Sequence, residues 1–155
     1  MKVLLKTLSM LRRQKTPINK RFRKMRYSFI HNLTKDVLDA DGNYKTVLEV
    51  GCHTGRDFLK YLTDRSDVKL HGLDIKDYGF RAQNFEMIIG DAENIDFPDK
   101  YFDLAVSFGV FEHIQPMEKL STAIKEIDRV SKNYVVMVPA INSLLEPHTC
   151  PSPLN

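Results

Sequence analysis

From residue 46 onwards, hydrophobic positions fall into short apolar runs separated by polar segments. Such a pattern is typical of buried β-strands joined by crossover connections. The runs that predict strands are 46–50, 69–74, 85–89, 102–108 and 134–138. Apolar residues at helical spacing predict helices over 56–63 and 116–131, whereas 77–84 is too short and irregular for a helix. We therefore expect an α/β fold in which an open, mostly parallel sheet is covered on both faces.

The first 40 residues carry a different pattern. Residues 2–13 predict a short amphipathic helix with leucines on one side and basic residues on the other, and 21–38 predicts a second helix. A turn signal, Asp41-Gly42-Asn43, follows. We divide the chain into a basic helical arm (1–40), a sheet domain (41–139) and an irregular tail (140–155). Four of the seven prolines lie in the last seventeen residues.

Charge is distributed unevenly along the chain. Residues 1–35 hold eleven Lys or Arg and no acid, whereas the other 120 residues hold twelve bases and twenty acids. A basic arm of this kind can be a solvated face, lie on an anionic membrane, or contact RNA phosphates. Because residues 2–13 have a real apolar face, peripheral membrane or partner-helix contact is favoured over RNA.

Other compositional features narrow the class of protein. No apolar run approaches the length needed to span a bilayer. The two cysteines, Cys52 and Cys150, lack metal-type spacing, and the five histidines are scattered, so no metal site is predicted. Free cysteines favour a reducing compartment. We expect a cytoplasmic protein, with membrane association through the basic arm as an alternative that stays open.

The candidate chemistry begins where the first strand ends. Gly51 and Gly55 flank a short loop before a helical pattern, an arrangement that can bring backbone N–H groups close to an anionic group. Asp74 ends the second strand and could accept hydrogen bonds from ribose hydroxyls. Asp91 follows the third and could accept from an exocyclic amine. A dinucleotide site would require glycine at positions 53 and 56, where this chain has His and Arg, so that class is disfavoured.

Four motifs in order resemble class I S-adenosylmethionine-dependent methyltransferases, in particular the small "type 11" methyltransferase domain, over about residues 45–139. The motifs are 49–55, 90–98, 102–114 and 125–130. The resemblance implies a Rossmann-like sheet, S-adenosylmethionine as the cofactor, and methyl transfer to a small-molecule, lipid or sugar acceptor.

The resemblance also implies roles for individual residues. Those that would hold the methionine end of the cofactor are Glu49, Gly51, Cys52, His53 and Gly55. Those that would contact the nucleoside are Asp74 at the ribose, Ile75 at the adenine, Asp91 at the adenine amine and Ala92 beside it. Ser107 and Phe108 would line the floor near the sulfonium. His113 is the candidate general base, for acceptors that must lose a proton.

Two features depart from the family pattern. His53 replaces the middle glycine and brings a side chain close to the expected carboxylate of the cofactor. Family members usually continue with two antiparallel edge strands, and this chain has no residues for them. An alternative prediction is therefore a truncated or inactive cofactor-binding domain that acts as an interaction module. The exposed edge of its last strand would favour a homodimer.

Overall fold

The computed structural model describes residues 17–55 and 58–138 of the 155-residue chain. These residues belong to two compact units: residues 17–31 fall in the first and 32–138 form the second. Helix α2 (Pro17–Leu38) confirms the helix predicted over 21–38 and begins at a proline, a residue favoured in the first helical turn. The predicted helix 2–13 and the tail 140–155 lie outside the described residues.

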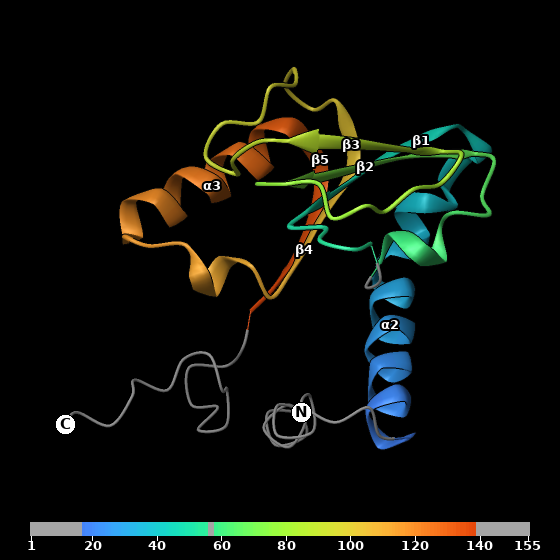
Figure 1. Cartoon of the computed structure of the whole chain (residues 1–155). Coiled ribbons are helices and arrows are strands. Elements are labelled where there is room, and N and C mark those ends of the chain that lie inside the picture. The colour runs from blue at the N-terminus through green and yellow to red at the C-terminus, as the bar shows by residue number, and fades with distance from the viewer. Residues whose placement is uncertain (1–16, 56–57, 139–155) are drawn as a thin grey trace. The chain divides into compact units, whose positions relative to one another are not determined.

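A five-stranded sheet forms the centre of the 32–138 unit (Figure 1). Its strands are β1 (Lys45–Val50), β2 (Val68–Asp74), β3 (Phe85–Ile89), β4 (Phe102–Phe108) and β5 (Ser131–Met137). The strand order is β3-β2-β1-β4-β5, and all four pairings are parallel. The predicted Rossmann-like α/β fold is confirmed. The order reverses between β1 and β4, the place where ligands bind in open parallel sheets.

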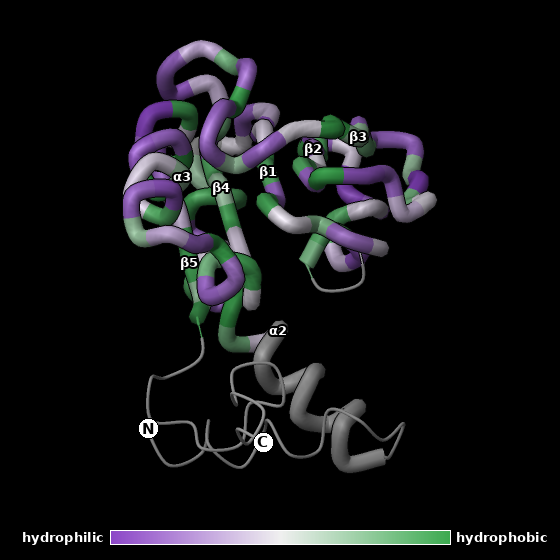
Figure 2. The backbone as a smooth tube through the Cα atoms, turned by 60° about the vertical axis from the view of Figure 1, so that its left-hand side comes forward, coloured by the Kyte–Doolittle hydropathy of each residue, from purple (hydrophilic) through white to green (hydrophobic). Residues whose placement is uncertain are grey.

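The core lies between the sheet and helix α3 (Met117–Val130). Ala123, Ile127 and Val130 on α3 belong to the same buried cluster as Leu48 of β1 and Ala105 of β4. Figure 2 shows β4 as mainly hydrophobic and much of the connecting loops as polar. The helix predicted over 116–131 is therefore confirmed, and its apolar stripe covers one face of the sheet.

Two sequence predictions differ from the structure. The predicted helix 56–63 is wrong over its described part, residues 58–63, which form only a 3₁₀ turn at Leu59–Tyr61. The Leu59 N–H donates to the buried Glu49 carboxylate, so this N–H makes no hydrogen bond within a helix. Strand β5 starts at Ser131, three residues before the predicted 134–138. Residues 132–134 are exposed and two are polar, so they lack the apolar signal of a strand.

Hydrogen bonds from α3 hold the connection between β3 and β4. The Arg129 guanidinium donates to the carbonyl oxygens of Phe97 at 2.7 Å and Ile95 at 2.8 Å. Glu126 accepts from the Ile95 N–H at 2.9 Å and pairs with Arg129. This pairing lowers the pKa of Glu126 below its ordinary value, because the guanidinium favours the ionised carboxylate. Two side chains of one helix thus anchor an otherwise irregular crossover.

Removing this anchor should destabilise the fold. In Arg129→Ala two carbonyl oxygens and the Glu126 carboxylate lose their donor, so we expect the free energy of unfolding to fall by about 2 kcal/mol. Urea denaturation followed by circular dichroism measures this. The control is Lys125→Ala, an exposed residue of the same helix, for which we expect a change within about 0.5 kcal/mol. Equal urea midpoints for Arg129→Ala and the control would contradict the anchoring role.

Candidate functional site

The turn after β1, residues 51–55 (the glycine turn), contains three left-handed residues: Gly51 (φ 75°), His53 (φ 46°) and Gly55 (φ 64°). Glycine is also required sterically at two of these positions. A Cβ at Gly51 would lie 2.2 Å from a methyl group of Val110, and one at Gly55 would lie 2.4 Å from the Phe80 ring. The segments after β2 and β4 therefore pack directly on the backbone of this turn.

Most amide groups of the glycine turn are used within the protein. Gly51 and Cys52 both donate to the Leu73 carbonyl, at 2.7 and 3.3 Å, and Gly55 donates to Cys52 at 2.7 Å. The His53 N–H donates to the Asp74 carboxylate at 2.9 Å. Four of the five N–H groups therefore stabilise the turn itself. This differs from the sequence expectation that they would face an anionic ligand.

Asp74 joins the ends of β1 and β2. One oxygen of its carboxylate accepts from His53 N–H, and the other accepts from Ile75 N–H at 2.8 Å. The carboxylate is half-buried, and each oxygen has a second lone pair with which it can accept a further hydrogen bond. Next to it, the Ile75 side chain is 73% exposed. An acceptor carboxylate and an apolar surface thus lie together at the carboxyl end of β2.

Three predicted site residues are buried behind this surface. Glu49 is 2% exposed and accepts from Leu59 N–H at 3.3 Å. Ser107 is fully buried, and its hydroxyl donates to the Val50 carbonyl at 3.0 Å, which links β4 to β1. Burial, followed by the nearby carboxylates of Glu49 and Asp74, raises the pKa of the Cys52 thiol to about 12. Cys52 is therefore a protonated packing residue at neutral pH.

The remaining predicted cofactor residues follow β3 and β4. The exposed Asp91 accepts from Glu93 N–H at 3.0 Å and starts a turn. Ala92 is half-buried and packs against the core cluster. Phe108 is half-buried, with its ring 5.8 Å from that of Phe58. Since all these segments leave the carboxyl ends of parallel strands, the topology gathers them at the same edge of the sheet as the glycine turn.

His113 lies in a 3₁₀ turn (Phe111–His113) after β4, and its side chain is 54% exposed. Its Nε2 is 3.8 Å from an oxygen of Glu112, which is only 11% exposed. The other Glu112 oxygen is buried and has no hydrogen-bond partner within the described residues. Of this adjacent pair, sequence reasoning selected the exposed histidine and missed the buried carboxylate, because neighbouring positions in an irregular turn give no burial pattern.

A second group missed by the sequence analysis is the segment 76–81, which we call the aromatic turn. The Tyr78 ring stacks on the His53 ring with 3.9 Å between centroids, and the Lys76 ammonium lies 4.7 Å from the Tyr78 centroid. Asp77 folds the segment by accepting from Gly79 N–H and from Arg81. These bonds lower the pKa of Asp77 to about 2. The sequence feature that could have indicated this segment is the density of aromatic residues after β2.

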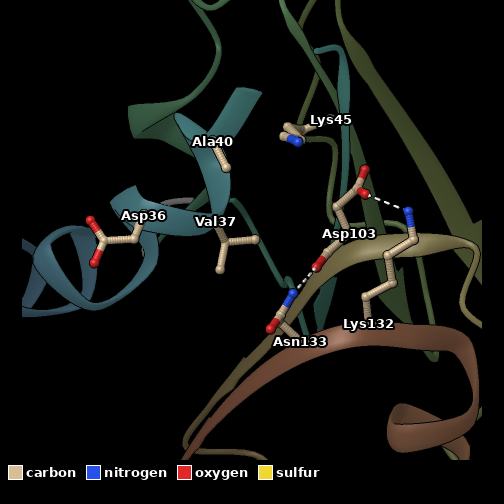
Figure 3. A pocket seen from close by; sticks show the side chains of 7 residues that line it. All are labelled: Asp36, Val37, Ala40, Lys45, Asp103, Lys132 and Asn133. Atoms are coloured by element: carbon tan, nitrogen blue, oxygen red, sulfur yellow. Dashed lines mark hydrogen bonds and ion pairs between the residues drawn. The ribbon is translucent and has the colours of Figure 1, made fainter. Parts of the chain in front are cut away.

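A separate cleft of about 350 Å³ lies at the opposite, amino end of the strands (Figure 3). It is lined by Asp36, Val37, Ala40, Lys45, Asp103, Lys132 and Asn133. Asp103 is bonded within the protein, since it accepts from Lys132 at 2.8 Å and from Thr46 N–H at 2.9 Å. These bonds lower the pKa of Asp103 despite the opposing effect of burial, which is the largest single influence. The cleft is therefore part of the network that joins β1, β4 and β5.

Residues 17–55 and 58–138 contain neither a helix able to span a membrane nor a ready-made metal site. None of the helices in that part of the chain combines the length and the apolar character needed to cross a membrane. Within the same residues, no group of three or more His, Cys, Asp or Glu side chains is placed to hold a metal ion.

Comparison with known proteins identifies the domain. A family model described as a methyltransferase domain matches residues 48–138. Probable tRNA methyltransferase 9B of Mus musculus is 35% identical over 88 residues, which are 54% of this chain and 19% of that protein. Ajmaline N-methyltransferase of Rauvolfia serpentina is 28% identical over 111 residues, which are 64% of this chain and 37% of that protein. The chain thus matches well under half the length of these relatives.

Solved structures agree at the level of the fold. A SAM-dependent methyltransferase from Methanosarcina mazei superposes with a TM-score of 0.53 at 22% identity, and the match covers 68% of this chain and 53% of that one. The family match includes β1 from Leu48 onwards, the other four strands and α3, and with them the glycine turn, Asp74 and Asp91. The chain belongs to the methyltransferase domain family, for which S-adenosylmethionine is the indicated cofactor.

Proposed function

We propose that this chain binds S-adenosylmethionine at the carboxyl ends of β1 to β4 and transfers its methyl group to an acceptor. The observation that carries the proposal is the link between Asp74, at the end of β2, and the glycine turn, which follows β1 next to the point where the strand order reverses. When bound, the cofactor supplies a methyl group already activated by a sulfonium. The protein's own tasks are then to bind, to orient the acceptor and to exclude water.

The individual roles follow from what each side chain has to offer. The remaining lone pairs of Asp74 accept from the ribose hydroxyls, and the exposed Ile75 side chain provides an apolar surface for the adenine. Asp91 and Ala92 lie on the next strand end and bind the adenine edge. Glu49 and Ser107 act indirectly, because both are buried and hold the glycine turn and the β1–β4 pair in place.

For the acceptor we propose a small molecule, a lipid or a sugar. The name of the Rauvolfia relative refers to N-methylation of ajmaline, a small molecule. RNA is the second candidate, favoured by the name of the mouse relative and by the eleven basic and no acidic residues in 1–35. His113, exposed beside Glu112 after β4, remains the candidate base for an acceptor that must lose a proton.

A cofactor-binding module without turnover is the alternative from a different class. The described residues contain five parallel strands and no antiparallel strand. Strand β5 pairs only with β4 among them, and Tyr134 on β5 is 46% exposed. An unpaired edge of this kind favours association. In this alternative a homodimer forms through β5 and the domain binds S-adenosylmethionine without transferring its methyl group.

Asp74 should be essential for cofactor affinity. Asp74→Ala removes a charged acceptor, and we expect the affinity for S-adenosylmethionine to fall about 10- to 100-fold in isothermal titration calorimetry. Asp74→Asn keeps an acceptor for the His53 N–H, so its affinity for S-adenosylmethionine should fall less. Asp64→Ala, an exposed carboxylate outside the site, is the matched control and should bind like wild type. Wild-type affinity in Asp74→Ala would contradict the proposed ribose site.

The acceptor class can be read from where a labelled methyl group goes. With tritium in the methyl group of S-adenosylmethionine, we expect the purified chain to label the low-mass or lipid fraction of a cell extract. Label in tRNA would instead support the RNA candidate. If the cofactor binds but no fraction is labelled, the module without turnover is supported and methyl transfer is contradicted.

Residues 2–13 are proposed to contact anionic membranes. Deletion of these residues removes the leucine face and four basic residues, Lys2, Lys6, Arg12 and Arg13. We expect the deletion to reduce co-sedimentation with phosphatidylserine vesicles several-fold, since each basic residue near an anionic surface contributes roughly 1 kcal/mol. Sedimentation unchanged by the deletion, at equal salt, would rule out membrane contact through this segment.

A further inference from the structure

We propose that His53 supplies a side-chain hydrogen bond to the carboxylate of the cofactor's methionine end. The inference rests on the proposed S-adenosylmethionine site and concerns the position at which this chain departs from the family's glycine pattern. Three observations carry it: four of the five amide groups of the glycine turn are already engaged, the His53 ring is held in place, and its Nε2 has no partner within the described residues.

The first observation concerns the supply of donors. An anionic group at a strand end is ordinarily bound by backbone N–H groups. Here the amides of Gly51, Cys52, His53 and Gly55 donate to Leu73, Asp74 and Cys52 instead. A carboxylate that leaves water for this turn still needs donors, because an unpaired charge is costly to desolvate. A side chain must therefore supply some of the hydrogen-bond donors that the backbone does not.

The second observation is that the His53 ring is pre-positioned. Its backbone is fixed by the bond to Asp74, and its ring stacks on Tyr78 at 3.9 Å with 30° between the planes. Tyr78 is itself held in the aromatic turn, which Asp77 closes through Gly79 and Arg81. A ring that is already immobilised loses little further freedom when it binds a ligand, so each hydrogen bond contributes more affinity.

The third observation concerns which nitrogen of the His53 ring can donate a hydrogen bond. Nδ1 of His53 lies 3.3 Å from the Thr54 hydroxyl. When that hydroxyl donates to Nδ1, the proton of a neutral imidazole sits on Nε2, and a protonated ring carries protons on both nitrogens. Nε2 is a donor in both of these states, whereas it is an acceptor in the neutral tautomer whose Nδ1–H donates to the Thr54 hydroxyl; a hydrogen bond to the cofactor's carboxylate requires one of the first two. Within the described residues Nε2 has no protein partner, and the His53 side chain is exposed.

The experiment compares two ligands that differ only in the carboxylate. Isothermal titration calorimetry is run with S-adenosylmethionine and with decarboxylated S-adenosylmethionine. For His53→Ala we expect the affinity for S-adenosylmethionine to fall about tenfold, as for loss of a hydrogen bond to a charged group. The affinity for the decarboxylated ligand should change less than twofold. The histidine control, His31→Ala on α2, should leave both affinities unchanged.

Further variants separate the hydrogen bond from the shape of the turn. Asn tolerates a left-handed backbone and carries an amide donor, so His53→Asn should recover part of the lost affinity. His53→Gly relieves the backbone but has no donor, and should lose as much affinity as His53→Ala. Tyr78→Phe keeps the stacking and should bind like wild type, whereas Tyr78→Ala frees the ring and should give an intermediate loss. Thermal unfolding checks that each variant is folded.

The possible outcomes distinguish this inference from the function on which it rests. If wild type binds S-adenosylmethionine and His53→Ala or His53→Gly preserves its preference over the decarboxylated ligand, the role of His53 is wrong while the cofactor site stands. Equal losses for both ligands would mean that the variants distort the turn, which also overturns a carboxylate contact. If wild type binds neither ligand, the proposed function fails first and this inference fails with it.

Discussion

The hydrogen bond from the His53 N–H to the Asp74 carboxylate is the contact on which the rest of the site depends. It connects the turn after β1 to the end of β2, and the Leu73 carbonyl reinforces it by accepting from two amides of the same turn. A backbone with three left-handed residues in five is costly unless its surroundings hold it. These bonds do so, and they also place the Asp74 carboxylate where it has capacity for a ligand.

Short turns and side-chain hydrogen bonds replace helices in several crossovers of this domain. Only a 3₁₀ turn is described between β1 and β2, the aromatic turn follows β2, and Arg129 holds the connection between β3 and β4. Such connections bury less apolar surface than a helix would, so more of the stability rests on a few polar contacts. The candidate site is also built from irregular connections, because Val110 and Phe80 contact the glycine turn from segments that are not helical.

Sequence patterns predicted the strands well because each contributes an apolar run to a sheet whose central strands are buried on both faces. These patterns failed where the burial of side chains does not follow a regular period along the chain. The apolar residues of 58–63 have the spacing of a helix, but the Leu59 N–H donates to the Glu49 carboxylate and the segment forms a single 3₁₀ turn. The start of β5 was missed because an edge strand can be polar where it is exposed. The predicted site residues lie at or near the carboxyl ends of β1 to β4, although the local pattern did not distinguish the buried Glu112 from the exposed His113.

The fold class, the class of cofactor and the edge of the sheet at which we propose the site could be predicted from the chain alone, since these follow from apolar periodicity and from motifs confined to short stretches of sequence. Only the tertiary structure decided which polar groups are available to a ligand. Three amides of the glycine turn, Glu49 and Ser107 are engaged by partners from other segments, whereas the His53 ring stacks on Tyr78, 25 positions further along the chain. Hydrogen bonds and ring contacts between segments distant in sequence leave no periodic trace, so no local pattern can reveal them.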